Sequence, residues 1–326
     1  MSSSPADPLD DVTPHLWVVI LAGGVGSRFW PASTPSHPKQ LLPLAGPRPL
    51  IRETVERIVP LIPQERLRIL TGSHLATPIC GALPELGPGN LLIEPRAAGT
   101  GPVLAWAAAE IERRDPDAVM VSLHADHVID PPEAFRARIR LAAELAVRER
   151  RLFTLGARPD RPETGYGYIR VGAPLGEAGA DTGYAVEAFV EKPDRSTAEA
   201  YLRDGGYLWN TGLFVWRVAD LLEQLERFTP EIAPLIPILR EGGTEEFFRR
   251  TPSLSIDNGL LERSDRVGVL PADFHWDDVG SWDAVYRTHA RDQAGNVTIG
   301  DAHAVDAQGC ALYAGDGPIV AFGVED

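Results

Sequence analysis

Residues 18–44 read VVILAGGVGSRFWPASTPSHPKQLLPL, and this stretch decides the fold class. It begins in an apolar run, 17–22, whose composition is typical of a buried parallel strand. The run ends in GGVGSR at 23–28, where the glycines let backbone N–H groups approach an anion closely. Arg28 and Lys39 add two positive charges to the same loop. A strand that opens into such a loop is suited to bind a polyphosphate.

Two common phosphate-binding loops do not fit these residues. The dinucleotide fingerprint G-x-G-x-x-G would need a third glycine where this chain has Phe29. A Walker loop would need a Lys-Ser or Lys-Thr pair after the glycines, and none follows them. A tight turn with an exposed arginine remains the alternative for the glycines alone, because short glycine motifs often match by chance.

The full string resembles the signature of the sugar-nucleotide pyrophosphorylases, L-A-G-G-x-G-[ST]-R-[LF]-x-P-x-[ST] followed by P-K. Within that family, Trp30-Pro31 and Lys39-Gln40 make it most similar to the mannose-1-phosphate guanylyltransferases. The resemblance implies a nucleotidyltransferase that makes GDP-mannose and pyrophosphate from GTP and mannose 1-phosphate with Mg²⁺. It also implies nucleotide contacts throughout this loop, at Leu21, Ala22, Gly23, Gly24, Gly26, Ser27, Arg28 and Lys39.

The composition limits the possible partners and the compartment. The 326 residues include 46 acidic and 31 basic side chains, and a net charge of −15 argues against nucleic-acid or membrane-surface binding. An anionic substrate therefore needs a local basic pocket. Cys80 and Cys310 form neither a metal spacing nor a disulfide framework, which favours a reducing, cytoplasmic location. No apolar run approaches the roughly 20 residues of a membrane span.

Strand and helix patterns alternate from residue 16 onward. They predict strands at 16–22, 67–70, 91–93, 118–123, 152–156, 184–191, 208–216 and 267–270, and helices at 50–62, 103–113, 133–150, 196–204 and 218–226. This alternation predicts an α/β domain over 16–290, with a Rossmann-like mixed, mainly parallel sheet covered by helices. Ligands of such sheets bind at the carboxyl ends of the strands.

Both ends of the chain differ from this domain. Residues 1–15 are polar and acidic without the features of a signal peptide, and we expect a disordered tail. Residues 291–326 contain short apolar pieces between Gly/Asp turns, which predicts a small β appendage resembling the start of a β-helix. Relatives usually continue past this point, so we expect the end to be truncated or completed by a neighbouring subunit in a homodimer.

Residues 121–127, VSLHADH, follow a predicted buried strand. A carboxylate at that position suits Mg²⁺, which prefers one or two carboxylates with phosphate oxygens and water. The string resembles the family's L-P-[SA]-D-H, with His124 in place of Pro, and implies that Asp126 contacts the nucleotide and binds the metal. Two alternatives stay open from the residues alone: a zinc site of His124, Asp126 and His127, and a turn aspartate that caps the next helix.

A second acidic motif lies at 274–282, FHWDDVGSW. Adjacent carboxylates on an extended chain point to opposite faces, so only one of Asp277 and Asp278 can face a cleft. The string resembles the family's F-x-W-x-D-V-G-S-W. That resemblance implies Asp278 as the second metal ligand, forming a two-carboxylate Mg²⁺ site with Asp126, and leaves Asp277 exposed.

Three further strings resemble the sugar-binding motifs of the family. Residues 190–194 contain E-K-P, which implies that Glu191 contacts sugar hydroxyls and that Lys192, a compact point charge, binds the sugar phosphate. ETGYGYI at 163–169 and LWNTGLF at 208–214 imply sugar contacts at Gly167 and Asn210. We expect Tyr168, Trp209 and Phe214 to be core residues. In catalysis, Arg28 and Lys39 would neutralise the departing pyrophosphate and Lys192 would hold the sugar phosphate.

The loop at 94–102, EPRAAGTGP, departs from the family's E-P-x-x-R-[ND]-T-A-P. Ala98 replaces the arginine and Gly99 the asparagine, although the position before a helix N-terminus still implies nucleotide contacts at Glu94, Arg96, Gly99 and Thr100. The change predicts relaxed base discrimination, with Arg96 as the compensating group. It also keeps open a nucleotidyltransferase for another base or hexose 1-phosphate. A non-catalytic sugar-nucleotide-binding regulatory protein is a further alternative. The presence of all five charged residues that catalysis would need favours the enzyme; they are Arg28, Lys39, Asp126, Lys192 and Asp278.

Overall fold

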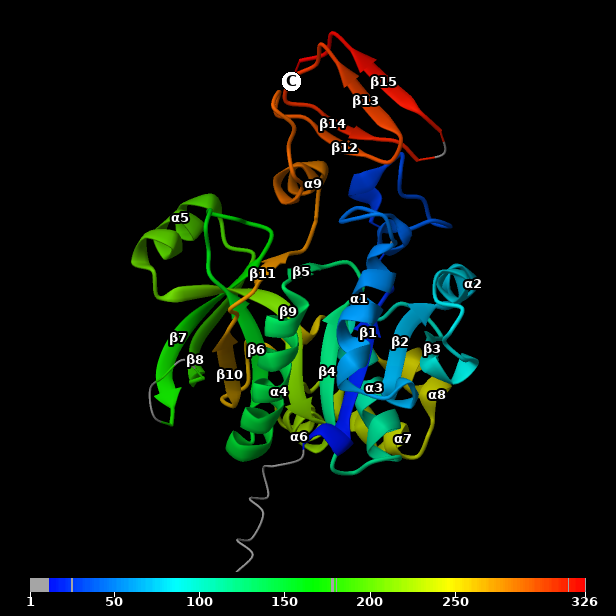
Figure 1. Cartoon of the computed structure of the whole chain (residues 1–326). Helices are drawn as coiled ribbons and strands as arrows, with labels where there is room; N and C mark the ends of the chain where they lie inside the picture. Colours follow the sequence, from blue (N-terminus) through cyan, green and yellow to red (C-terminus); the bar gives the residue numbers. More distant parts are fainter. Residues whose placement is uncertain (1–11, 25, 177–178, 180, 316, 326) are drawn as a thin grey trace, which may run out of the picture.

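A nine-stranded sheet forms the centre of the protein in the computed structural model, which describes residues 12–24, 26–176, 179, 181–315 and 317–325 (Figure 1). The strand order is β3-β2-β1-β4-β9-β6-β10-β8-β7. These strands are β1 (Leu16–Leu21), β2 (Leu67–Gly72), β3 (Leu91–Glu94), β4 (Val119–His124), β6 (Leu152–Ala157), β7 (Gly167–Leu175), β8 (Gly183–Glu191), β9 (Tyr207–Arg217) and β10 (Val267–Pro271).

Helices cover both faces of the sheet (Figure 1). Alternate residues of β1 face opposite sides: Val18 and Ile20 pack in one core, and Trp17 and Val19 in the other. The first core includes α1 (Leu50–Ile58), α2 (Ser73–Ala82), α4 (Pro132–Glu149) and α5 (Arg195–Asp204). The second includes α3 (Thr100–Glu112), α6 (Val218–Phe228), α7 (Ile236–Arg240) and α8 (Thr244–Arg250).

The fold is α/β and its sheet is mixed, but fewer of the strand pairings are parallel than the sequence predicts. Parallel pairings join β3, β2, β1 and β4, and a further one joins β6 to β10. The remaining pairings, which involve β7, β8 and β9, are antiparallel. The strand at 167–175, which the sequence patterns did not predict, pairs with both β8 and β9 and accounts for part of this difference.

A small two-stranded pairing brings two distant loops to the site. β5 (Val128–Asp130) runs antiparallel to β11 (His275–Asp277), with Val128 opposite Asp277. This register places the residues just before β5 beside those just after β11. Asp126 and Asp278 belong to these two loops, and the pairing therefore explains why motifs so far apart in sequence meet.

The C-terminal segment forms rungs of parallel strands above the sheet (Figure 1). β12 (Val297–Ile299) pairs with β14 (Ala311–Tyr313), and β13 (Ala302–Val305) pairs with β15 (Ile319–Phe322). Together with α9 (Trp282–Thr288), β12 packs on a cluster that includes Phe29, Leu42 and Leu44 of the first loop. The appendage is thus joined through its core to the loop that follows β1.

The structure describes only the last residues, 12–15, of the N-terminal tail predicted from the sequence. Residues 1–11 lie outside the described residues, but Thr13–His15 form a 3₁₀ helix. His15 Nδ1 lies 2.9 Å from Asp115 Oδ1, and Arg66 donates to the carbonyl of Thr13. Among the described helices, none combines the length and apolar character that a membrane crossing requires.

Candidate active site

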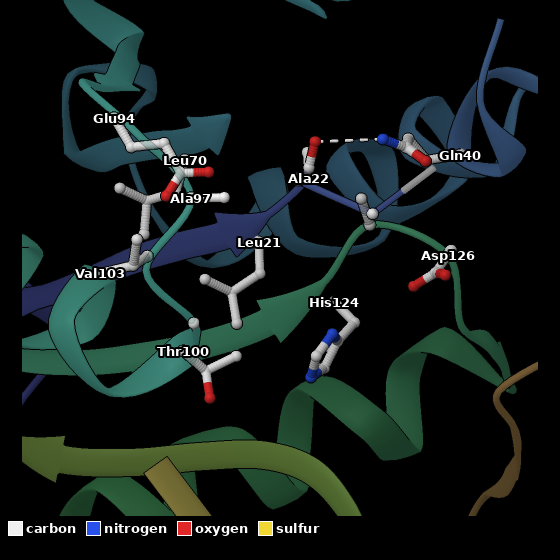
Figure 2. Close-up of a pocket in the computed structure, with 14 residues that line it drawn as sticks. Leu21, Ala22, Gln40, Leu70, Glu94, Ala97, Thr100, Val103, His124 and Asp126 are labelled. Atoms are coloured by element: carbon white, nitrogen blue, oxygen red, sulfur yellow. Dashed lines mark hydrogen bonds between the residues drawn. The ribbon is translucent and has the colours of Figure 1, made fainter. Parts of the chain in front are cut away.

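The glycine loop after β1 brings a lysine against the end of the strand. Gly26 has a left-handed backbone (φ 68°), and a Cβ at this position would collide with the Cβ of Lys39. Ser33 Oγ donates to the carbonyl of Gly26 at 2.5 Å and fixes the turn. Gln40 Nε2 donates to the carbonyl of Ala22 at 3.1 Å, which ties the Lys39 segment to the strand end (Figure 2).

A cavity of about 330 Å³ opens beside the strand end and the N-terminus of α3 (Figure 2). We call it the glycine-loop cavity, and it is lined by Leu21, Ala22, Gly23, Gly24, Gln40, Leu70, Glu94, Ala97, Gly99, Thr100, Val103, His124, Ala125 and Asp126. It therefore brings together eight expected nucleotide contacts, namely Leu21, Ala22, Gly23, Gly24, Glu94, Gly99, Thr100 and Asp126.

The basic residues expected to form an anion-binding pocket do not line this cavity. Its described lining residues include no lysine or arginine. Arg28 is exposed in the 3₁₀ helix Ser27–Phe29 and forms no ion pair or side-chain hydrogen bond within the described part of the chain. Lys39 is buried behind Asp126 instead of facing the cavity directly. The two charges thus lie beside the cavity, on the loop that leaves it.

Lys39 connects the two acidic motifs. Its Nζ donates to Asp126 Oδ2 at 2.8 Å and to the backbone carbonyl of Asp278 at 2.6 Å. Asp278 Oδ1 accepts from the hydroxyl of Tyr166 at 2.6 Å and from the N–H of Gly280 at 3.1 Å. The other oxygen of each carboxylate, Asp126 Oδ1 and Asp278 Oδ2, has no hydrogen-bond donor within the described residues.

The two carboxylates have opposite pKa shifts. Burial by itself would raise the pKa of Asp126, but Lys39 and the rings of His127 and His124 oppose it and lower that pKa to about 2. Burial raises the pKa of Asp278 above its usual value, against the hydrogen bond from Tyr166 and the charge of Lys39. Asp126 is therefore the more firmly ionised of the pair at neutral pH.

A second cavity, of about 230 Å³, adjoins the first. We call it the β8–β9 cavity, and its lining residues are Thr100, His124, His127, Gly165, Tyr166, Gly167, Glu191, Lys192, Asn210, Thr211, Gly212, Phe214, Ile256, Asp257, Trp276 and Asp278. Thr100 and His124 line both cavities. The four expected sugar contacts and Asp278 therefore lie together, next to the expected nucleotide contacts.

Local backbone geometry positions the polar groups of the β8–β9 cavity. A Cβ at Gly167 would lie 2.5 Å from Glu191 Oε2, so glycine makes room for this carboxylate. Lys192 has a left-handed backbone (φ 48°), and its exposed ammonium donates to Glu191 Oε1 at 2.6 Å. As expected, Tyr168, Trp209 and Phe214 are buried in the core.

Asp277 is not exposed, and the expectation from the sequence is wrong on this point. Its side chain is 3% exposed, because Arg287 Nη2 donates to Oδ2 at 2.6 Å and the N–H of Val279 donates to Oδ1 at 2.8 Å. Asp277 and Asp278 do point to different partners, as the extended chain predicts. Asp277 therefore anchors α9 to the loop, and its role is structural.

Arg96 does not reach the glycine-loop cavity. Its Nε donates to the carbonyl of Phe248 at 2.7 Å and its Nη2 to that of Thr251, at the end of α8. The guanidinium group is therefore bound on the side of α8, and the expected compensation for the missing arginine at position 98 has no support in this geometry.

The neighbouring loop residues are adapted to close packing. Gly99 has a left-handed backbone (φ 82°), and a Cβ would lie 2.5 Å from the carbonyl oxygen of Leu254. Gly101 donates to that same carbonyl at 3.0 Å, and Leu254 donates to the carbonyl of the fully buried Ala98 at 3.0 Å. This loop is thus joined to residues 254–256, which leaves no room for larger side chains at Gly99.

His124, Asp126 and His127 lie close enough to hold a metal ion, with ligand atoms within 4.8 Å of one another. However, Trp276 Nε1 donates to His127 Nδ1 at 3.2 Å. Burial lowers the pKa of His127 well below its usual value, so the ring is neutral and its proton is on Nε2. His127 then has no free lone pair for zinc, and the arrangement favours a carboxylate site over the zinc alternative.

Comparison with known proteins agrees with this geometry. The family model described as nucleotidyl transferase matches residues 17–295, which contain both cavities. The chain belongs to the nucleotidyl transferase family. Members of this family generally use a divalent metal ion, which is consistent with Asp126 Oδ1 and Asp278 Oδ2, the carboxylate oxygens that accept no hydrogen bond from the described residues.

Individual relatives of this nucleotidyl transferase carry more specific names. The chain is 37% identical to the xanthan biosynthesis protein XanB of Xanthomonas campestris pv. campestris, over 98% of this chain and 68% of that protein. It is also 37% identical to a mannose-1-phosphate guanylyltransferase of Klebsiella pneumoniae, over 94% of this chain and 67% of that one. A solved structure from Thermus thermophilus, described as a mannose-1-phosphate geranyltransferase, has a TM-score of 0.86 and 35% identity, covering 95% and 90% of the two chains.

Some residues of this nucleotidyl transferase's site were missed at the level of sequence. Gln40 lies in the first motif and lines the glycine-loop cavity, so its place next to Lys39 was a usable signal. Tyr166 lies within ETGYGYI, but its bond to Asp278 spans 112 positions and could not be inferred from spacing. Asp257 lines the β8–β9 cavity and belongs to none of the motifs.

Proposed function

We propose that the protein is a mannose-1-phosphate guanylyltransferase, which converts GTP and mannose 1-phosphate into GDP-mannose and pyrophosphate. The observation that carries the proposal is the meeting of two cavities at Thr100 and His124, with Asp126 lining one and Asp278 the other. A transfer between two substrates needs adjoining pockets, because the reacting atoms must approach within bonding range. The names of relatives that match nearly the whole chain support the choice of substrates.

In this proposal the nucleotide occupies the glycine-loop cavity. Leu21, Leu70 and Val103 offer an apolar lining that suits a base, and Glu94 and Thr100 offer polar groups near the start of α3. The triphosphate would extend along the glycine loop, where Arg28 is exposed and Lys39 lies behind Asp126. Backbone N–H groups of the loop would bind phosphate oxygens closely.

The hexose phosphate would occupy the β8–β9 cavity. Glu191 and Asn210 offer groups that bind hydroxyls, and Gly167 lets the backbone approach the ring. The exposed ammonium of Lys192 would exchange its contact with Glu191 for the sugar phosphate. Nucleotide and sugar phosphate would then face each other across Thr100 and His124.

The chemistry follows from the substrates. A phosphate oxygen of mannose 1-phosphate attacks the α-phosphorus of GTP and forms a new P–O bond, while the bond to the oxygen bridging the α- and β-phosphates breaks and pyrophosphate leaves. The attacking oxygen is already anionic, so no general base is required. Catalysis then depends on positioning and charge neutralisation, with Lys192 holding the sugar phosphate and Arg28 and Lys39 stabilising the departing pyrophosphate.

We further propose Mg²⁺ as the metal. Asp126 and Asp278 fit a hard cation, because each is a carboxylate with one oxygen that no described donor occupies. Bound there, the ion would neutralise phosphate oxygens near the reaction centre. A homodimer and a cytoplasmic location remain predictions from the sequence.

A second candidate is a nucleotidyltransferase with a different base preference. The observation that favours it is the loop with Ala98 and Gly99, where Leu254 leaves no room for a side chain at Gly99 and Ala98 is fully buried. The phosphate-binding and metal-binding groups lie elsewhere, so this candidate shares the mechanism.

Pyrophosphate release with each of the four NTPs, combined with mannose 1-phosphate or glucose 1-phosphate, tests the proposal. We expect the highest kcat/KM for GTP with mannose 1-phosphate. A different best pair would support the second candidate, and release that does not depend on any hexose phosphate would refute nucleotidyl transfer to a sugar.

A further inference from the structure

Asp257 lines the β8–β9 cavity from an unusual helix. It begins the π-helix Asp257–Leu261, in which the N–H of Glu262 donates to the carbonyl of Asp257 at 3.0 Å. Single π turns are rare and often occur at functional sites. The segment is fixed to the rest of the site, since the N–H of Ile256 donates to Thr100 Oγ1 at 2.8 Å.

Asn210 orients this carboxylate, and its own orientation is defined by its partners. The backbone N–H of Gly212 donates to Asn210 Oδ1 at 3.2 Å, and Thr154 Oγ1 donates to the same atom at 2.9 Å. Because a backbone N–H can only donate, that atom must be the amide oxygen. The amide nitrogen therefore faces Asp257 and donates to its Oδ1 at 3.0 Å.

The described residues leave part of the acceptor capacity of the Asp257 carboxylate unused. An ionised carboxylate has about four acceptor positions. The N–H of Asn210 is the one side-chain donor that the described residues supply to it. Burial, followed by the nearby charge of Glu191, raises the pKa of Asp257 to about 6, against the opposing effects of Lys192 and Asn210. Each of these two carboxylates accepts one side-chain hydrogen bond from the described residues, from Asn210 and from Lys192 respectively, and hydroxyl groups of a ligand would supply further ones.

We propose that Asp257 is a sugar-binding residue that, opposite Glu191, accepts hydrogen bonds from hydroxyl groups of the hexose 1-phosphate and determines which hexose is used. The inference rests on the proposed function of the same site and assigns its sugar specificity to a residue outside the sugar-binding strings at 163–169, 190–194 and 208–214. Asn210 acts here as a positioning residue for Asp257. A buried group built to bind a hydroxyl strongly rejects a sugar that lacks it, and the carboxylate thereby discriminates between hexoses.

The test compares Asp257→Asn and Asp257→Ala with Glu262→Gln, a matched control in the same segment whose carboxylate is exposed. KM and kcat are measured for mannose 1-phosphate and for GTP. Mannose 1-phosphate binding is also measured by calorimetry. We expect Asp257→Asn to raise the KM for mannose 1-phosphate about tenfold or more and to change the mannose-to-glucose preference by a similar factor. The KM for GTP and all values of Glu262→Gln should stay within about twofold.

Deoxy sugars separate a binding role from a structural one. The 2-, 3-, 4- and 6-deoxy forms of mannose 1-phosphate are compared in the wild type and in Asp257→Asn. We expect at least one deoxy sugar to bind the wild type more weakly than mannose 1-phosphate does. The same deoxy sugar should bind Asp257→Asn as well as mannose 1-phosphate does, because its missing hydroxyl is the partner of Asp257.

Equal losses for all four deoxy sugars in both proteins, or unchanged KM and hexose preference in folded Asp257→Asn, would overturn the proposal. Asp257→Asn preserves shape, so the test stands even if Asp257→Ala does not fold. A wild type that binds mannose 1-phosphate without turning over GTP would refute the proposed function, while the calorimetric comparison would still test Asp257.

Discussion

Lys39 holds the two acidic loops of the site together, donating from Nζ to Asp126 Oδ2 at 2.8 Å and to the carbonyl of Asp278 at 2.6 Å. The lysine side chain is 7% exposed, so this charge has little access to water. In the proposed reaction the same ammonium serves the pyrophosphate. In that proposal Lys39 is both a structural link and a catalytic residue, and its replacement should affect stability as well as rate.

Lys39→Met should abolish turnover and lower the free energy of unfolding by about 2 kcal/mol, because it leaves the ionised Asp126 without its partner. This loss of stability is smaller than the loss expected for a fully buried ion pair, because the Asp126 side chain is 30% exposed. Mg²⁺ should restore stability to this variant more than to the wild type, because the freed carboxylate then binds the ion. Thermal unfolding with and without Mg²⁺ measures both effects. An equal response of the two proteins to Mg²⁺ would argue against Asp126 as a metal ligand.

Substitutions of the adjacent aspartates Asp277 and Asp278 should have different effects, one on stability and the other on activity. Asp126→Ala and Asp278→Ala are each expected to abolish turnover and keep the fold. Asp277→Ala should instead lower the free energy of unfolding by about 3 kcal/mol, because Arg287 loses its buried partner and the N–H of Val279 its acceptor.

Asp283→Ala, an exposed carboxylate on α9, is the matched control for this set and should be neutral. Urea unfolding and pyrophosphate release are measured on each variant. A stable, fully active Asp277→Ala would show that the Arg287 pair contributes nothing, and activity in Asp278→Ala at saturating Mg²⁺ would rule out its metal role.

The loop at 94–102 should affect which nucleotide base the enzyme prefers, and Arg96 should not contribute to this preference. We expect the wild type to prefer GTP but to use ATP measurably, because the loop lacks the two polar side chains of the family motif. Arg96→Ala should lower the free energy of unfolding by about 1–2 kcal/mol, since it removes bonds to the carbonyls of Phe248 and Thr251. The GTP-to-ATP ratio of kcat/KM should not change in this variant. A changed GTP-to-ATP ratio would indicate that Arg96 does contribute to nucleotide recognition.

Asp257→Asn should stabilise the protein at neutral pH while impairing sugar use. The pKa of Asp257 is about 6 in the folded protein, against 3.8 for the free side chain. The folded state therefore binds more protons than the unfolded state between these values, and stability falls as the pH rises through this window. Allowing for partial exposure, the variant should gain about 2 kcal/mol at about pH 7.5, and the gain should vanish near pH 4. A gain that is independent of pH would exclude ionisation of Asp257 as its cause.

The sequence predicts the elements that carry strong local patterns. The run before the glycines is β1, and the long helix at 133–150 matches α4 within one residue at each end. The motifs also predict many of the residues that line the two cavities, because strand ends of one sheet edge lie close together. Five expected nucleotide contacts line neither cavity, namely Gly26, Ser27, Arg28, Lys39 and Arg96.

What the sequence misses depends on contacts between distant residues. Asp277 is buried by a pairing with Arg287 across a turn whose path the motif does not define. Arg96 finds its carbonyl partners 152 and 155 positions away. Asp257 occupies a π turn, which has no sequence pattern that distinguishes it from an ordinary helix. Hydrophobic periodicity and short motifs carry no information about such partners.

The most direct test of the central claim follows the α-phosphate of GTP. The protein is incubated with Mg²⁺, GTP labelled at the α-phosphate, and mannose 1-phosphate, and the products are separated by anion exchange. The account predicts that the label moves into GDP-mannose, with one pyrophosphate released for each molecule formed, and that Asp126→Ala forms none. Label that remains in GTP, or appears in GMP or GDP without any nucleotide sugar, would contradict it.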